Sequence, residues 1–151
     1  VITAESLQRI GEYVGKAPVF SSCEDAEKYI RLVSAPFGAL SDAQWRHLAE
    51  SSLRHAADGR LEMRYDPGIG EPFRQALAFQ NVDLWPIYDR IRCTTLVVRG
   101  AESDLLTPET LRAMAARGPR PRTVEIPAVG HAPMFLDAGQ IGVVREFLLD
   151  A

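Results

Sequence analysis

Residues 95–100 read Thr-Leu-Val-Val-Arg-Gly, a compact apolar and β-branched run that ends at a glycine. A run of this kind is typical of a strand covered on both faces, as in a parallel sheet. A second strand is predicted at residues 123–126, and between the two lies a helix with Thr107 as N-cap and Pro108 in its first turn. Strand, helix and strand in this order form a βαβ unit, so we expect two parallel strands joined by a right-handed crossover.

The crossover helix is predicted to end at Gly118-Pro119, and a last helix is predicted to run to the C-terminus. The crossover helix is expected to bury a stripe of Leu111, Met114 and Ala115, and the last helix carries Ile141, Val144, Phe147 and Leu148. Two parallel strands are too few for a stable sheet. The missing strands therefore have to come from another chain, or this chain forms the end of a larger sheet.

The first ninety residues favour helices joined by turn-rich loops. Three residues are predicted to be helix N-caps: Thr3, Ser22 and Ser41. The first helix is expected to stop at Gly15 and the second before Pro36. Gln44 completes a capping box with the third of these caps.

The third helix has the clearest apolar face, and it is predicted to reach Asp58-Gly59. That face comprises Trp45, Leu48, Ala49, Ser52, Leu53 and Ala56. Residues 61–65 alternate in polarity and predict a short extended stretch. Two further short helices are expected, one starting at Pro72 and one at residues 84–86 after Asp83 as a cap.

Length and composition indicate an ordinary globular domain. The chain has 151 residues, with 17 Lys and Arg against 20 Asp and Glu, so the net charge is −3. This charge argues against nucleic acid as the main partner, and no apolar run approaches the ~20 residues that span a bilayer. Two cysteines are too few for a disulfide framework, so we expect a reducing compartment, namely the cytoplasm. The chain begins without Met or a signal peptide, so we expect it to be part of a longer protein.

Candidate site residues follow the two predicted strands. Ligands bind beyond the carboxyl ends of parallel strands, and the segments there are residues 100–104 and 127–133. Asp104 and His131 lie on these neighbouring loops. We expect the carboxylate to fix the tautomer of the imidazole, so that the other ring nitrogen accepts a proton.

These segments resemble parts of the α/β-hydrolase family. Residues 91–106 look like its acid strand and loop, and residues 129–133 look like its histidine loop. The resemblance implies a fragment of an α/β-hydrolase fold: a mostly helical cap (lid) segment over residues 1–90, followed by a parallel βαβα unit of the core over residues 91–151. It implies Asp104 as the catalytic acid and His131 as the general base, and it implies no metal and no organic cofactor.

The implied activity is hydrolysis of an ester or related carbonyl in a small substrate. Ten of the twelve aromatic residues lie before residue 91, and these favour a largely apolar substrate. None of the eight serines has glycine two residues before and two residues after it, so the Gly-x-Ser-x-Gly nucleophile turn is missing. We therefore expect this chain alone to be inactive, and to self-associate through the exposed strand edge at residues 95–99.

Three alternatives stay open at this stage. One is a dehalogenase-like or epoxide-hydrolase-like enzyme with an aspartate nucleophile, in which the acid and histidine loops look alike. Another is a non-catalytic binding module on the same fold. The third is an independent small domain that dimerises to complete its sheet.

Other reactive side chains favour structural interpretations. Cys93 precedes its strand and is expected at the opposite sheet edge, and Cys23 lies beside two acidic residues that oppose thiolate formation. Ser103 is expected to be a loop hydrogen-bonding residue. His47 and His55 are expected on the solvated face of the third helix and not in a metal site.

Overall fold

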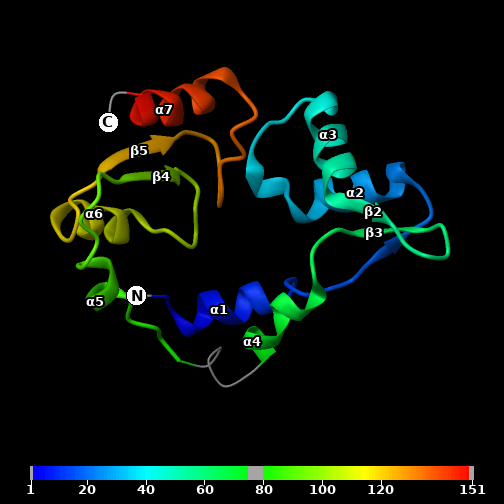
Figure 1. The fold of residues 1–151 in the computed structure, drawn as a ribbon, viewed down its shortest axis with the longest axis horizontal. Coiled ribbons are helices and arrows are strands. Elements are labelled where there is room, and N and C mark those ends of the chain that lie inside the picture. The colour runs from blue at the N-terminus through cyan, green and yellow to red at the C-terminus, as the bar shows by residue number, and fades with distance from the viewer. Residues whose placement is uncertain (1, 75–79, 150–151) are drawn as a thin grey trace. The chain divides into compact units, whose positions relative to one another are not determined.

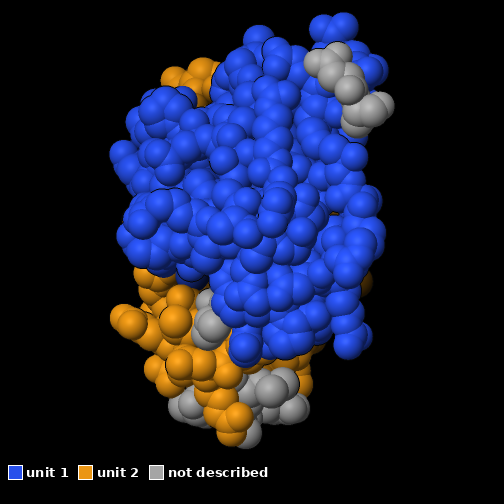
Figure 2. Space-filling model, turned by 90° about the vertical axis from the view of Figure 1, so that its left-hand side faces the viewer, with its two compact units in different colours: residues 1, 36–39, 83–151 blue, residues 2–35, 40–82 orange. Residues whose placement is uncertain are grey.

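The computed structural model describes residues 2–74 and 80–149. They form two compact units, which Figure 2 distinguishes by colour. Unit 1 contains Pro36–Ala39 and the chain from Asp83 onward, and unit 2 contains Ile2–Ala35 and Leu40–Val82. The assignment of residues 1–90 to a cap and 91–151 to a catalytic core concerns function, and it stays a prediction.

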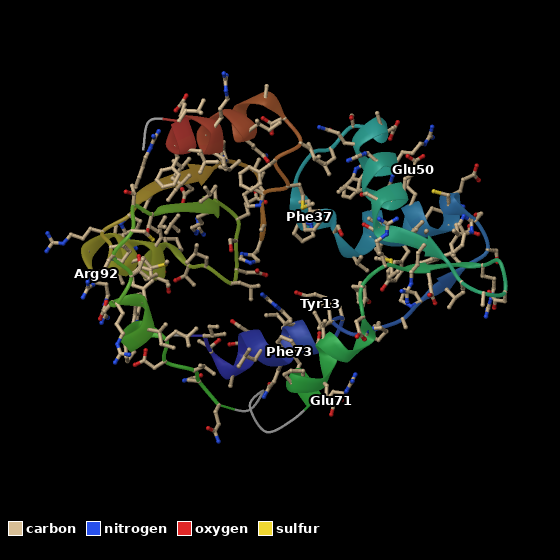
Figure 3. The ribbon with its side chains drawn as sticks, viewed as in Figure 1. Tyr13, Phe37, Glu50, Glu71, Phe73 and Arg92 are labelled. Atoms are coloured by element: carbon tan, nitrogen blue, oxygen red, sulfur yellow. The ribbon has the colours of Figure 1, made fainter. Side chains whose placement is uncertain are left out.

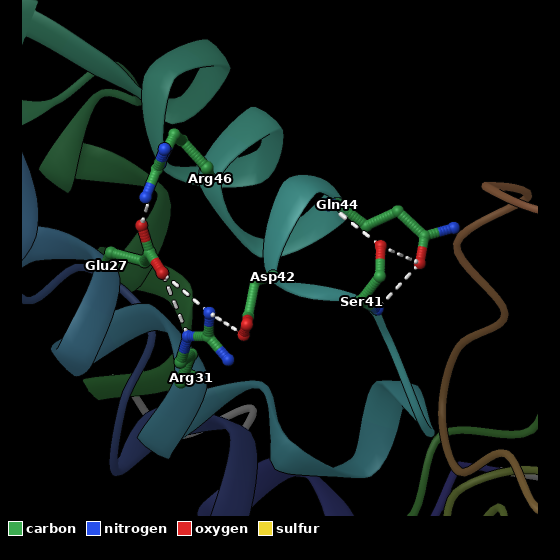
Figure 4. Close-up of polar contacts among 6 residues, drawn as sticks. All are labelled: Glu27, Arg31, Ser41, Asp42, Gln44 and Arg46. Atoms are coloured by element: carbon green, nitrogen blue, oxygen red, sulfur yellow. Dashed lines mark hydrogen bonds and ion pairs between the residues drawn. The ribbon is translucent and has the colours of Figure 1, made fainter.

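Unit 2 is built mainly from helices that begin where the sequence predicts. Its elements are α1 (Ala4–Gly11), β1 (Val19–Phe20), α2 (Cys23–Val33), α3 (Asp42–Ser52), β2 (Leu53–His55), β3 (Leu61–Met63), η2 (Pro67–Gly70) and α4 (Glu71–Arg74). The short helix η1 (Ala35–Phe37) follows α2, and its last two residues belong to unit 1. The side chains of Thr3, Ser22 and Ser41 each accept a hydrogen bond from a backbone N–H of the first turn, as predicted. The capping box of Ser41 and Gln44 is also confirmed, and it is drawn in Figure 4.

Two predicted helix ends are wrong. Helix α1 ends at Gly11 and not at Gly15, and α3 ends at Ser52 and not at Asp58-Gly59. The backbone of Leu53 is already extended, and Leu53–His55 pairs antiparallel with Leu61–Met63. Strand β3 also pairs with β1, which gives the order β1-β3-β2. Pairing with the strand that follows six to ten residues later therefore outweighs the helical pattern, and His55 lies on a strand.

The buried side chains of unit 2 come from several of its elements. They are Phe20, Ala26, Ile30, Trp45, Leu48, Ala49 and Leu53. Beside them, Arg31 bridges Glu27 of its own helix and Asp42 of α3, with N–O distances of 2.7 and 2.8 Å (Figure 4). In another part of the unit, Phe73 of α4 lies against α1 (Figure 3). Helices α2 and α3 are therefore held by apolar packing and by a charged bridge.

Unit 1 contains the predicted βαβα arrangement (Figure 1). Its elements are α5 (Trp85–Tyr88), β4 (Leu96–Gly100), α6 (Pro108–Ala116), β5 (Arg122–Ile126) and α7 (Ala138–Leu149). Strands β4 and β5 are parallel, with Leu96 opposite Arg122 and Gly100 opposite Ile126. Thr107 caps α6, and the Asp83 carboxylate accepts the Trp85 N–H at the start of α5.

The strands of unit 1 are less covered than the sequence predicts. Residues 96–98 are only half-buried, and Ala115, expected on the buried stripe of α6, is exposed. Within the described residues, the sheet of unit 1 has two strands. The last helix ends at Leu149, and the final two residues lie outside the described part of the chain.

None of the helices in residues 2–74 and 80–149 is long and apolar enough to cross a membrane.

Candidate active site

The two loops that carry Asp104 and His131 lie side by side at one edge of the parallel sheet. Gly100 and Ile126 end the two strands opposite each other. Beyond them, the Ala101 N–H donates to the Ile126 carbonyl at 2.8 Å, and the Glu102 N–H donates to the Val129 carbonyl at 2.9 Å. The backbone pairing thus continues past the strands and joins the loops directly.

Two glycines permit this close approach. A Cβ on Gly100 would lie 2.1 Å from the Gly130 carbonyl oxygen, and a Cβ on Gly130 would lie 2.8 Å from the Pro36 carbonyl oxygen. The Gly130 N–H donates to that same Pro36 oxygen at 2.7 Å. The backbone next to His131 is therefore held between β4 and residues 36–39, and no larger residue fits at either glycine without a shift of the backbone.

A buried arginine fixes the loop after β4. The Arg99 side chain is only 4% exposed. Its guanidinium donates to the Leu106 carbonyl at 2.5 Å and to the Ser103 carbonyl at 3.1 Å, and it pairs with Glu125 of β5 at 2.6 Å. A planar guanidinium can reach three acceptors at once because its N–H groups form a rigid fork. The loop between Ser103 and Leu106 is thereby tied to both strands.

Ser103 connects that loop to the imidazole. Its buried hydroxyl accepts the Leu106 N–H at 3.0 Å and lies 3.2 Å from Nδ1 of His131. Ser103 is therefore the loop hydrogen-bonding residue that the sequence predicts. Its contact with the imidazole was not predicted.

Asp104 follows Ser103 directly, and both Asp104 and His131 are exposed. The structure thus brings the loops of the two predicted site residues to one sheet edge. Their roles as acid and base stay predictions. Sequence reasoning missed Arg99, which was interpreted only as the end of an apolar run, and it missed the segment around Pro36.

The other candidate residues lie elsewhere. Cys93 precedes β4 and adjoins Arg92, which Figure 3 labels at the amino end of that strand, so it lies at the opposite sheet edge as predicted. Cys23 begins α2 in unit 2, and His47 and His55 are exposed there. Among the residues that the structure describes, no three His, Cys, Asp or Glu side chains are grouped as a metal site would require.

Comparison with known proteins identifies the family. The sequence profile of the alpha/beta hydrolase family matches residues 10–142. The chain therefore belongs to the alpha/beta hydrolase family, in agreement with the parallel sheet and its helices.

Individual relatives extend this finding. A 3-hydroxybutyrate-oligomer hydrolase of Cupriavidus necator is 39% identical over 158 residues, a match that covers 99% of this chain and 54% of that protein. An alpha/beta hydrolase structure from Novosphingobium aromaticivorans matches with a TM-score of 0.83 and 31% identity, covering 99% of this chain and 53% of that one. The structure of E-2-(acetamidomethylene)succinate hydrolase has a TM-score of 0.77 at 21% identity, which shows the fold alone. The chain spans about half the length of these relatives.

Proposed function

We propose that this chain supplies the acid and the histidine of a serine-type hydrolase that cleaves esters. Asp104 stabilises the imidazolium of His131, and His131 moves the proton of a serine nucleophile from the part of the fold that this chain does not contain. The observation that carries the proposal is the hydrogen-bonded pairing of the two loops at the carboxyl edge of β4 and β5.

The substrate class that we propose is a short ester of small hydroxy acids. The relative at 39% identity is named for 3-hydroxybutyrate oligomers, which are joined by ester bonds. The aromatic residues of the first ninety positions favour a largely apolar substrate of this kind. The cytoplasmic location stays a prediction from cysteine usage.

The test is a chimera in which residues 1–151 replace the matching part of the Cupriavidus necator hydrolase. We expect the chimera to hydrolyse 3-hydroxybutyrate oligomers and the 151-residue chain to be inactive. His131→Ala and Asp104→Asn should each lower kcat by about ten-thousand-fold. His55→Ala, an exposed histidine of unit 2, is the matched control and should retain full activity.

Two outcomes decide between this proposal and its rivals. Fluorophosphonate labelling of the chimera that is lost in His131→Ala shows that this chain can activate a serine nucleophile, whereas a chimera that stays unlabelled contradicts that role. Hydrolysis that persists in the His131→Ala chimera contradicts the role of the imidazole and favours a non-catalytic part for this chain.

We further propose that the chain on its own self-associates through the edge of β4 at residues 95–99. Within the described residues β4 pairs only with β5, so one row of its backbone groups faces no strand. The apolar side chains of Ile141, Leu148 and Leu149 on α7 are also exposed, and they border a hollow of about 590 Å³. Uncovered apolar surface of this kind favours association.

A further inference from the structure

We propose that Ser103, held in place by Arg99, is a positioning residue that fixes the tautomer of His131. The inference rests on the proposed function, because a fixed tautomer matters only if the imidazole acts as a base. It assigns to the serine hydroxyl a role separate from that of the carboxylate of Asp104: the hydroxyl orients the neutral ring, and the carboxylate stabilises the ring when it is charged.

The contacts of Ser103 put its hydroxyl where it can select the tautomer of the imidazole. A serine hydroxyl has two lone pairs and one proton. One lone pair accepts the Leu106 N–H at 3.0 Å, and the hydroxyl oxygen lies 3.2 Å from Nδ1 of His131, where it can accept the Nδ1 proton or donate its own. The proposed function requires the first direction, because acceptance of the Nδ1 proton leaves Nε2 unprotonated, which is the form that a general base requires.

Arg99 fixes the position of the hydroxyl through the backbone of its loop. The guanidinium holds the carbonyl of Ser103 and the carbonyl of Leu106, and Leu106 in turn donates to the hydroxyl. The pairing of Arg99 with Glu125 anchors this arrangement to β5. Because the whole side chain of Arg99 is buried, these three contacts define one position for the loop.

The position of the imidazole is set by a separate group of backbone hydrogen bonds. The residues before His131 are bonded through Val129 to Glu102 and through Gly130 to Pro36. Ser103 is therefore anchored through its own carbonyl, and His131 through the two residues before it. An arrangement of this kind lowers the cost of orienting the ring when a substrate is bound.

The first experiment reads the tautomer directly in the 151-residue chain. Two-bond ¹H–¹⁵N correlation spectra, recorded above the ordinary imidazole pKa of about 6.5, report which ring nitrogen carries the proton. We expect Nδ1–H for His131, and the averaged pattern of exposed imidazoles for His47 and His55. A proton on Nε2 of His131 would overturn the proposal, and this measurement requires no variant.

Variants then test the roles of the two positioning side chains. Ser103→Ala should convert the His131 signals to the averaged pattern, whereas Ser103→Thr, which keeps the hydroxyl, should retain the Nδ1–H pattern. Arg99→Lys should lose part of the tautomer preference, because an ammonium cannot reproduce the fork. Arg112→Lys is the matched control, since Arg112 lies exposed on α6, and it should leave the spectra unchanged. Unchanged His131 signals in Ser103→Ala refute the role of the hydroxyl.

Activity in the chimera separates this inference from the proposed function. Ser103→Ala should lower kcat by about tenfold, the equivalent of one hydrogen bond, and leave KM unchanged. If His131→Ala abolishes hydrolysis but Ser103→Ala changes neither tautomer nor kcat, the positioning role is wrong and the proposed function stands. If the tautomer depends on Ser103 but His131→Ala retains hydrolysis, the proposed function fails and the positioning of the ring remains.

Discussion

The two units of the molecule bury different kinds of side chain. In unit 2 the buried side chains are apolar and come from α2, α3, β1 and β2. In the described part of unit 1 the buried apolar side chains are those of Val129 and of two prolines, Pro121 and Pro133, and they are accompanied by the buried polar residues Arg99 and Ser103. Unit 2 thus has an apolar core of its own, whereas the loops of unit 1 are held by hydrogen bonds and close backbone contacts. Substitutions should therefore act through cavities in unit 2 and through lost polar or backbone contacts in unit 1.

The largest effect should come from the core of unit 2. Trp45 is 7% exposed and is among the largest of the buried side chains. Trp45→Ala should lower the free energy of unfolding of unit 2 by about 3–5 kcal/mol, because the lost burial and the cavity add. Amide hydrogen exchange at increasing denaturant concentration measures this loss of free energy of unfolding for unit 2 alone. Leu32→Ala, at a side chain that is 78% exposed on α2, is the control and should change little. An equally small effect of both substitutions would contradict an apolar core in this unit.

A somewhat smaller effect is expected from the backbone contact of unit 1. Gly100→Ala places a Cβ against the carbonyl oxygens of Gly130 and Val129, and both are backbone atoms that cannot rotate away. We expect a loss of about 1–3 kcal/mol, measured by denaturation, together with shifts in the amide signals of the histidine loop.

Gly142→Ala provides the comparison for this substitution. Gly142 lies in α7 of the same unit, and nothing lies within 4 Å of its added Cβ. Alanine there should stabilise the helix by about 0.5–1 kcal/mol. If both alanine variants behave alike, the approach of the two loops is looser than the structure shows.

Local features of this fold could be predicted from the sequence, and distant contacts could not. The caps at Ser22, Ser41 and Thr107 involve residues three positions apart, so a short stretch of sequence contains the whole interaction. The parallel pairing of β4 and β5 followed from the order of elements, because a βαβ unit has one common topology. The end of α3 was wrong because Leu53 pairs with Met63, ten residues further on, and that partner competes with the local pattern.

The candidate site shows the same division. The loops of Asp104 and His131 could be placed at one edge because both directly follow strands. The burial of Arg99 could not be predicted, since its three acceptors come from a later loop and from the neighbouring strand. Arginine is also seldom buried, so its presence beside an apolar run resembles a strand end at the surface. The packing of Pro36 on Gly130 joins segments far apart in the chain, and no sequence pattern marks it.

The next prediction concerns self-association of the chain through the unpaired edge of β4. If the chain self-associates through β4, light scattering should show dimers or larger species whose proportion rises with concentration. The β4 amides that face away from β5 should then exchange more slowly at high concentration. A monomer at all concentrations contradicts the proposed edge pairing.

A double substitution distinguishes the strand edge from the apolar face of α7. Leu148→Lys with Leu149→Lys changes two side chains that are 67% and 69% exposed, and Leu32→Lys on α2 is the control. If the β4 edge is the contact, the double variant should weaken association by at most about tenfold. Complete loss of association without any response of the β4 amides would assign the contact to α7 instead.

The smallest expected effect is on how the stability of unit 1 depends on pH. This dependence also distinguishes an ion pair between distant residues from one between near neighbours in the chain. Arg117, at the end of α6, donates to the carboxylate of Asp89 and lies 4.5 Å from the centre of the Trp85 ring. The hydrogen bond from Arg117 holds the pKa of Asp89 below its usual value. A carboxyl with a lowered folded pKa stabilises the protein above its unfolded pKa, and this contribution is lost as the pH falls through the folded pKa. Asp89→Asn should therefore destabilise unit 1 at pH 7 and match the wild type near pH 2.

The turn of unit 2 supplies the control for this pH dependence. Arg60 likewise lowers the pKa of Asp58, but the two residues are only two positions apart. Such a pair can persist in the unfolded chain, so its pKa differs little between the two states, and pH-dependent stability requires a difference. Asp58→Asn should thus leave the fall of the free energy of unfolding at low pH unchanged. Asp89→Asn should reduce that fall, because Asp89 and Arg117 meet only when α5 and α6 are folded together. If the two variants lose stability equally as the pH falls, the contact of Asp89 with Arg117, 28 residues apart, depends on folding no more than that of Asp58 with Arg60.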